Sequence, residues 1–169
     1  EAVRILIPGV DLKLDPKGRG VCVSSFAAAV KLGLKRYFNG AVDHLKTEIV
    51  SEPSPGVAGG RVSYLVIYDN IPGGSGYLKE LLRADERTKR PENMVRLFKR
   101  AYEAVANCSC TSDETKDGCY HCVYQYGDAY QRQNVSRREA EHIMLKISSY
   151  KASQYKSEPV QNLAPEPLS

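Results

Sequence analysis

Apolar and polar residues follow two different periods along the first part of the chain, which indicates both strands and helices. Residues 3–8 (VRILIP) form a short run of side chains that favour β-structure. Within residues 26–38 (FAAAVKLGLKRYF) a large apolar side chain returns at every fourth position, as on one face of a helix. Ser24 and Ser25 come directly before this run, so we predict that one of them caps the helix.

Two more β-rich runs flank a segment of prolines and glycines. Residues 46–52 (KTEIVSE) and 62–69 (VSYLVIYD) have the composition of strands, and the loop PSPGVAGGR between them favours a hairpin. A glycine-rich turn then leads to a helix that we expect to open at residues 77–82 (YLKELL). The first half therefore predicts a small mixed or antiparallel sheet with helices packed on it.

Helical patterns dominate the second half of the chain. Pro91 stands at a favoured first position of a helix, and the apolar residues that follow it share one helical face. Ser136 and Glu139 form the S-x-x-E pattern of a capping box. This box predicts a last helix over roughly residues 137–150.

These elements predict a single α+β domain over residues 1–156. Residues 1–106 would form the half with the sheet and its helices, and residues 107–156 a helical module with the last helix. Residues 157–169 contain three prolines and no apolar period, which is typical of an extended tail.

Composition narrows the class of protein. The chain has 169 residues, of which 42% are hydrophobic and 26% are charged, as in an ordinary globular domain. No apolar run approaches the roughly 20 residues that span a bilayer, so we expect no membrane partner. The formal net charge of +4 permits contact with nucleic acid without arguing for it. Because the chain begins at Glu1, we expect it to be a piece of a longer protein.

Four of the five cysteines form a pattern typical of a metal site: C-x-C, a polar gap of eight residues, then C-x-x-C. They are Cys108, Cys110, Cys119 and Cys122. Two close pairs of thiolates joined by a turn can converge on one tetrahedral ion, and Zn²⁺ with four cysteine ligands is the most common result. Four protein ligands leave no open position, so such a zinc is structural. The clustering also favours a reducing compartment, such as the cytoplasm, over a disulfide framework.

Three alternatives to this site stay open at the level of sequence. One alternative is an iron–sulfur cluster, which also takes four cysteines. Another is redox or disulfide chemistry of the thiols. His121 lies inside the second pair and could replace a cysteine, but adjacent residues rarely both bind one ion, so we prefer Cys122. Cys22 is most simply a buried free thiol.

The residues that could offset the negative charge of the thiolates are Lys116, Arg132, Arg137 and Arg138.

The glycine-rich turn between a predicted strand and helix is a candidate anion-binding loop. Its residues are Gly73, Gly74, Ser75 and Gly76. Backbone N–H groups of such a turn can hold an anion. However, neither the P-loop motif nor the dinucleotide-binding motif is present, and a tight turn is the simpler interpretation.

Basic and aromatic residues suggest contact with nucleic acid. The candidate contacts are Arg96, Lys99, Arg100, Arg132, Tyr124 and Tyr126. Proteins that bind single-stranded nucleic acid use cations beside aromatic rings on which the bases stack. The alternative is a solvated helix face with tyrosines packed around the metal module. The three histidines are dispersed, so no hydrolytic site emerges, and Asp69 would be an acid or base without an identified second catalytic group.

The order of several motifs resembles one known family. The run YLVIYDNIPGGSGYLKEL, followed by C-x-C and then by GCYHC, is similar to the C-terminal zinc-binding domain of large superfamily 2 helicases, of the MrfA-like (MZB) type. The resemblance covers roughly residues 60–145. Val135-Ser136-Arg137 looks like the family's Leu-Asp-Arg, and Gly127-Asp128 stands where the family often has Asn-Gln. In the family the four cysteines bind zinc.

The resemblance implies a non-catalytic accessory domain of an ATP-dependent DNA helicase or translocase. Its partners would be the motor domains of the parent chain and DNA, and such helicases act in DNA repair or in defence against phage. The motor motifs are missing from this chain, so the ATPase would lie N-terminal to it. The competing interpretation is a protein-interaction module of a multi-subunit bacterial complex that does not touch DNA.

Overall fold

The computed structural model describes residues 1–6, 21–53, 61–124 and 131–149. Three strands form one antiparallel sheet in the order β1-β3-β2: β1 (Ala2–Leu6), β3 (Arg61–Asp69) and β2 (Leu45–Pro53). The predicted hairpin between the second and third strands is confirmed, and the N-terminal strand joins the free side of β3. Consequently β3 is central, and Leu65 lies opposite both Ile5 and Ile49.

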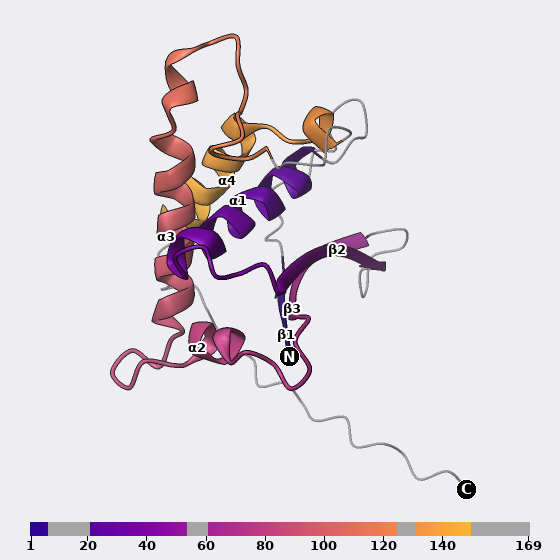
Figure 1. Ribbon diagram of the computed structural model, residues 1–169, viewed down its shortest axis with the longest axis vertical. Helices are drawn as coiled ribbons and strands as arrows, with labels where there is room; N and C mark the ends of the chain where they lie inside the picture. The colour runs from indigo at the N-terminus through magenta and orange to yellow at the C-terminus, as the bar shows by residue number, and fades with distance from the viewer. Residues whose placement is uncertain (7–20, 54–60, 125–130, 150–169) are drawn as a thin grey trace, which may run out of the picture.

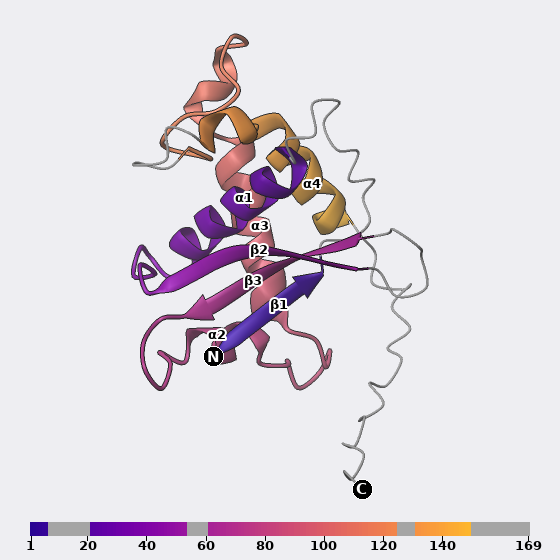
Figure 2. The same ribbon diagram turned by 90° about the vertical axis from the view of Figure 1, so that its right-hand side faces the viewer.

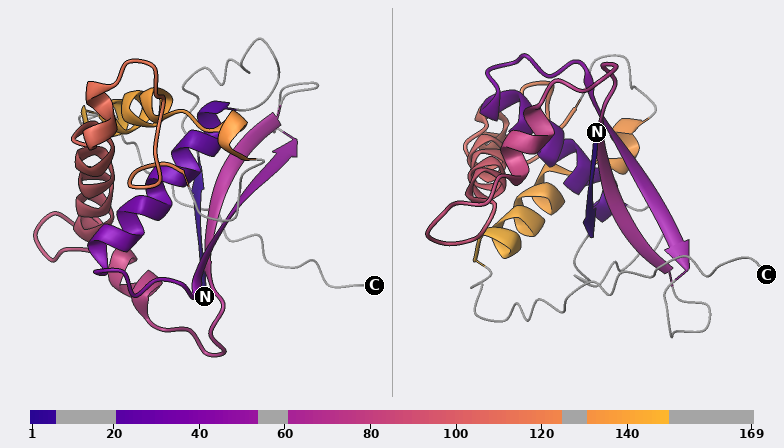
Figure 3. Two further views of the ribbon diagram at one scale, coloured as in Figure 1. Left: turned by 45° about the horizontal axis from the view of Figure 1, so that its top comes forward. Right: turned by 90° about the horizontal axis from the view of Figure 1, so that it is seen from below.

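Four α-helices and two short 3-10 helices complete the described part of the domain. They are α1 (Val21–Tyr37), α2 (Tyr77–Leu82), α3 (Glu92–Ala106), η1 (Ser109–Ser112), η2 (Gln131–Asn134) and α4 (Arg137–Ser149). The helices lie on one side of the sheet, and α1 packs against both α3 and α4 (Figures 1 and 2). The predicted α+β class is therefore confirmed. Seen from below, the sheet and the helices form two layers (Figure 3).

The core lies between the sheet and α1, and it continues between α1, α3 and α4. The helical face predicted from the apolar period of α1 is buried, with Phe26, Val30 and Leu34 almost fully shielded from solvent. Leu65 and Ile67 of β3 are also fully buried. Helix α4 contributes Ala140 and Met144 to the same core. The two predicted halves, residues 1–106 and 107–156, therefore share one core among the described residues.

Helix α1 begins earlier than expected, and this changes the role of its serines. The helix starts at Val21, so the prediction that Ser24 or Ser25 caps it is wrong. Ser25 is instead fully buried inside the helix, and its Oγ accepts a hydrogen bond from the backbone N–H of Ser136 at 2.9 Å. Ser25 therefore connects α1 to a segment that is distant in the sequence.

The capping box before α4 is half formed. The Glu139 backbone N–H donates to Ser136 Oγ at 3.1 Å, as predicted. In a full capping box the Ser136 N–H would donate to the Glu139 side chain, but here it donates to Ser25. The Glu139 carboxylate instead accepts a hydrogen bond from the Cys22 thiol at 3.3 Å. Helix α3 begins at Glu92, one position later than predicted, and Pro91 is its N-cap residue.

A glycine permits the closest approach of α1 and α3. A Cβ at Gly33 would lie 2.8 Å from the Cβ of Ala101 and 3.1 Å from the carbonyl oxygen of Leu97. Both distances are too short for ordinary contact, so only glycine allows this crossing without a shift of the helices.

Among the described residues, no helix is long and apolar enough to cross a membrane. The predicted extent of the domain, residues 1–156, stays a prediction, and the tail 157–169 lies outside the described residues.

Candidate metal centre

The first cysteine pair is positioned by the end of α3. Asn107 ends this helix with its backbone N–H bonded to the Glu103 carbonyl, and Cys108 follows directly. The chain then tightens into η1, which carries Cys110. Thr111 holds this turn together, because both its backbone N–H (2.9 Å) and its hydroxyl (2.8 Å) donate to the Cys108 carbonyl.

The second cysteine pair lies in a compact turn. The N–H groups of Cys122 and Tyr124 both donate to the Cys119 carbonyl, at 3.2 and 3.0 Å. Gly118 enters the turn with φ +146°, and a Cβ there would meet the Val123 side chain at 2.8 Å and the Tyr124 ring at 2.9 Å. The glycine just before the second pair is therefore required by space, since a larger residue would displace the turn.

The four sulfurs converge on one point. The Sγ–Sγ distances are 3.4 Å for Cys108–Cys119, 3.5 Å for Cys108–Cys110, and 3.7 Å for both Cys110–Cys122 and Cys119–Cys122. All four sulfurs lie within 4.8 Å of one another. A tetrahedral ion with metal–sulfur bonds of about 2.3 Å requires edges of about 3.8 Å. The cluster fits a single zinc ion closely, whereas a cluster of several irons would spread the thiolates among different metal atoms.

Burial favours the protonated thiols when no metal is bound. It raises the pKa of Cys110 to about 11 and raises the pKa of Cys122 further. Burial also acts on Cys119, but hydrogen bonds from the Cys108 thiol and the backbone N–H of His121 lower the pKa of that thiol below its usual value. The backbone N–H of Cys119 points at the Cys122 sulfur at 3.2 Å, a contact that becomes stronger when the sulfur is a thiolate. Metal binding must therefore displace protons.

The pKa of Lys116 reflects the charge of nearby cysteines. Its hydrogen bond to Asp113, at 2.7 Å, is the main cause that raises its pKa, and the charges of Cys110 and Cys119 raise it further. The other three cations predicted for this role have different described contacts. Arg132 lies over the Tyr120 ring, Arg137 pairs with Glu141, and Arg138 donates to the Glu114 carbonyl.

His121 does not join the cluster. Its side chain is exposed, and the described group of possible ligand atoms contains the four cysteines and no histidine. Cys22 lies in α1, bonded to Glu139, outside the cluster. The preference for Cys122 over His121 therefore agrees with the geometry.

The family model described as the MrfA Zn-binding domain (MZB) matches residues 26–123. This chain belongs to the MZB family. The match begins at Phe26, farther toward the N-terminus than the sequence motifs indicated, and it ends directly after Cys122. No curated protein and no solved structure matches the chain. The zinc-binding character of the MZB domain and the convergence of its four cysteines agree, so zinc is the cofactor, and iron–sulfur chemistry is only an alternative.

The glycine loop of this MZB domain is organised around a carboxylate of its own chain. Asp69 accepts the backbone N–H of Ile71 at 2.9 Å, and it accepts both the N–H and the hydroxyl of Ser75. These bonds lower the pKa of Asp69 to about 2. His44 Nε2 lies 3.1 Å from the Ser75 hydroxyl. The backbone N–H groups of Ile71 and Ser75 already donate to Asp69, and that of Gly74 donates to the Ile71 carbonyl at 2.9 Å, so none of the three is open to an external anion. Binding of an anion by Gly73, Gly74, Ser75 and Gly76 stays a prediction.

Three of the predicted nucleic-acid contacts share the exposed face of α3. Arg96, Lys99 and Arg100 are all exposed. Arg100 also has a structural contact, because its Nη1 donates to the carbonyls of Arg36 (3.0 Å) and Tyr37 (3.4 Å) at the end of α1. Arg96 and Arg100 line a shallow pocket with Tyr37 and other residues.

The other predicted contacts lie near the opposite end of α1. The Arg132 guanidinium is 4.6 Å from the centre of the Tyr120 ring, which meets the Tyr124 ring edge-on at 6.3 Å. Arg132 and Tyr124 line a groove that reaches Ala28 of α1, roughly 13 Å along the helix from Tyr37. The structure thus separates the predicted contacts into two groups, and Tyr126 lies outside the described residues.

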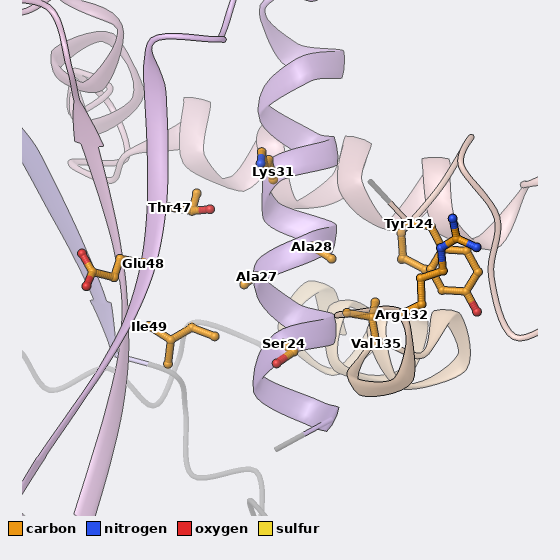
Figure 4. Close-up of a pocket in the computed structure, with 11 residues that line it drawn as sticks. Ser24, Ala27, Ala28, Lys31, Thr47, Glu48, Ile49, Tyr124, Arg132 and Val135 are labelled. Carbon is orange, nitrogen blue, oxygen red and sulfur yellow. The ribbon is translucent and has the colours of Figure 1, made fainter. Parts of the chain in front are cut away.

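This groove, with a volume of about 320 Å³, was not predicted from the sequence. Helix α1 forms its floor, residues of β2 form one wall, and the other wall consists of Tyr124, Arg132 and Val135 (Figure 4). Ile49 on the β2 wall is 39% exposed, whereas its neighbour Leu65 in the sheet is fully buried. No local pattern could have indicated the groove, because its walls come from three separate parts of the chain.

Proposed function

We propose that this MZB domain is a non-catalytic accessory module of an ATP-dependent DNA helicase or translocase that works in the cytoplasm. The zinc stabilises the fold and supports the motor domains of the parent chain, and the exposed basic face of α3 contacts DNA. The helicase parent, and a role in DNA repair or phage defence, follow from the resemblance of the sequence motifs to those helicases.

The observation that carries DNA contact is the basic face of α3. Arg96, Lys99 and Arg100 follow one another at helical spacing and are exposed. Arg100 joins them to the end of α1, where Lys35 and Arg36 are also exposed. These five exposed cations lie on two helices that pack against each other, and phosphate contacts of such side chains supply affinity without reading the base sequence.

A catalytic role is disfavoured by the state of Asp69. A carboxyl group whose pKa is lowered to about 2 stays charged at neutral pH, so it is a poor general acid and a weak base. Ser75 donates its hydroxyl proton to this carboxylate and not to His44, so these three residues do not form a nucleophilic triad.

Binding of the full chain to single-stranded and duplex DNA over a range of salt concentrations tests the proposal. Replacing Arg96 and Lys99 with alanine should weaken binding and reduce the slope of log K against log salt by about 0.7 to 0.9 for each lost phosphate contact. The matched control is the double replacement of Lys46 and Lys79 with alanine, which removes the same charge at exposed positions on β2 and α2. If DNA binding weakens equally in both double variants, net charge alone explains the effect and the face of α3 has no specific role.

A second candidate function is the docking of a partner protein, and the groove beside α1 favours it. The inner face of the sheet is incompletely covered at Ile49, and β2 is an edge strand to which an extended peptide could add. Replacing Ala28 with a larger residue such as leucine would fill the floor of the groove. If this module docks a partner protein and does not contact DNA, Ala28→Leu should abolish association with that partner, and the Arg96/Lys99 variant should not change DNA binding.

A further inference from the structure

The loop between the two cysteine pairs also forms the N-terminal cap of α4. The Arg137 backbone N–H donates to the Asp117 carbonyl at 2.9 Å. The Arg138 N–H donates to the Asp117 carboxylate Oδ1 at 3.1 Å, and the Glu139 N–H donates to Ser136 Oγ at 3.1 Å. The first three N–H groups of α4 thus all have partners, and one residue of the metal loop, Asp117, supplies two of them.

A side-chain contact strengthens this connection. Arg138 Nη2 donates to the Glu114 carbonyl at 2.9 Å, so the loop is held at two points by the first turn of α4. The negative charge of Asp117 also lies at the positive end of the α4 dipole. In Figure 1 the chain leaves the end of α3, forms the loop at the top of the view and returns toward α4.

The two sides of this contact differ in what holds them. Helix α4 is anchored in the core, because Ala140 and Met144 are fully buried and Ser136 is bonded to Ser25. Between η1 and Cys119 the loop has no helix or strand in the described chain. Its two ends are the cysteine pairs, so the metal is what closes it into a fixed shape.

We propose that Asp117 is a positioning residue that couples zinc binding to the start of α4. A bound zinc ion holds the loop so that Asp117 caps the helix, and the docked helix in turn holds the loop in the shape that brings the four sulfurs together. Because such coupling is reciprocal, loss of the cap must weaken zinc binding by the same factor by which zinc strengthens the cap. This inference does not depend on the proposed function.

Zinc affinity of the full chain, measured by competition with a chromophoric chelator, tests the coupling. Asp117→Ala should weaken zinc binding by about fivefold, the equivalent of one helix cap. Asp117→Asn keeps an oxygen that can accept the Arg138 N–H, so it should recover most of the affinity. The matched control is Glu114→Gln, which removes the same charge from the same loop and keeps the backbone contact with Arg138.

Two results would overturn the inference. One is an Asp117→Ala variant that binds zinc as tightly as the unchanged chain. The other is equal weakening in Asp117→Ala and Glu114→Gln, which would mean that only the charge of the loop matters. If Asp117→Ala does not fold, Ser136→Ala decides, because it removes the remaining cap without touching the loop: coupling requires weaker zinc binding in this variant, and unchanged binding contradicts it.

Hydrogen exchange gives a second readout, because it reports directly whether Asp117 protects the start of α4. In the zinc-bound chain, the amide of Arg138 should exchange faster in Asp117→Ala than in Glu114→Gln, while the amides of Leu97 and Val105 in α3 exchange alike in both variants. Equal protection of the Arg138 amide in the two variants would contradict the proposed role of Asp117.

Discussion

The buried hydroxyl oxygen of Ser25 accepts the backbone N–H of Ser136 at 2.9 Å, across 111 positions of sequence. This bond joins the second turn of α1 to the residue directly before α4. Because both groups are buried, neither can exchange its partner for water without moving the helices apart.

Replacing Ser25 with alanine should therefore destabilise the domain by about 1–3 kcal/mol, since the Ser136 N–H would lose its acceptor in a dry site. Chemical denaturation of the zinc-loaded chain measures this change. Ser24→Ala is the control, because Ser24 lies beside it on the groove and its loss should have a small effect. Equal losses of stability in the two variants would show that the buried hydrogen bond contributes no measurable stability of its own.

Removal of one clustered cysteine should remove the metal. Cys122→Ser is expected to reduce the zinc content from about one ion per chain to nearly none and to lower the melting temperature, because a structural zinc contributes directly to folding. Elemental analysis and thermal denaturation measure the two effects. Cys22→Ser should retain the zinc, since Cys22 lies outside the cluster. Retention of zinc by the Cys122 variant would mean that another ligand completes the site.

Zinc affinity should rise with pH. Burial raises the pKa of Cys110 to about 11 and raises that of Cys122 as well, so both metal-free thiols hold their protons at neutral pH. Zinc must displace these protons, and each proton released gives about a tenfold gain in affinity per pH unit. Competition titrations between about pH 6 and pH 8 measure this slope. An affinity that does not change over this range would mean that the cluster is already deprotonated before the metal binds.

The crossing of α1 and α3 should not tolerate a methyl group at Gly33. Gly33→Ala would place a Cβ 2.8 Å from the Cβ of Ala101, and we expect a loss of about 1–3 kcal/mol in the free energy of unfolding. Ala101→Gly removes the other methyl group. The double variant should therefore recover part of the stability lost by Gly33→Ala, which a double-mutant cycle measures. Strictly additive losses would exclude direct contact as the cause.

Local patterns in the sequence predicted the parts of this structure that depend on neighbouring residues. The cysteine spacing indicated the metal centre because C-x-C and C-x-x-C pairs must each fold within one turn. The hairpin of β2 and β3 and the buried face of α1 followed from the same kind of short period. In each case the chemistry and the geometry lie within a few positions of each other.

Features that join distant segments were not predicted. Ser25 looked like a helix cap because capping statistics treat a serine before an apolar run as a local signal. Its partner, Ser136, lies directly before another helix, and the Asp117 cap of that helix comes from a distant loop. The groove beside Ala28 depends on three elements at once. Such relationships follow from tertiary packing, which a single sequence does not display.

The bond between Ser25 and Ser136 also bears on how the chain is made. At about 5–20 residues per second, a ribosome adds the 111 positions between them in roughly 6 to 22 seconds. During that interval α1 has emerged without α4, while the cysteine pairs, only eight residues apart, are complete well before the last helix appears. The zinc loop is thus available to receive α4 as it leaves the ribosome, and the apolar face of α1 is the surface that a nascent-chain chaperone would meet.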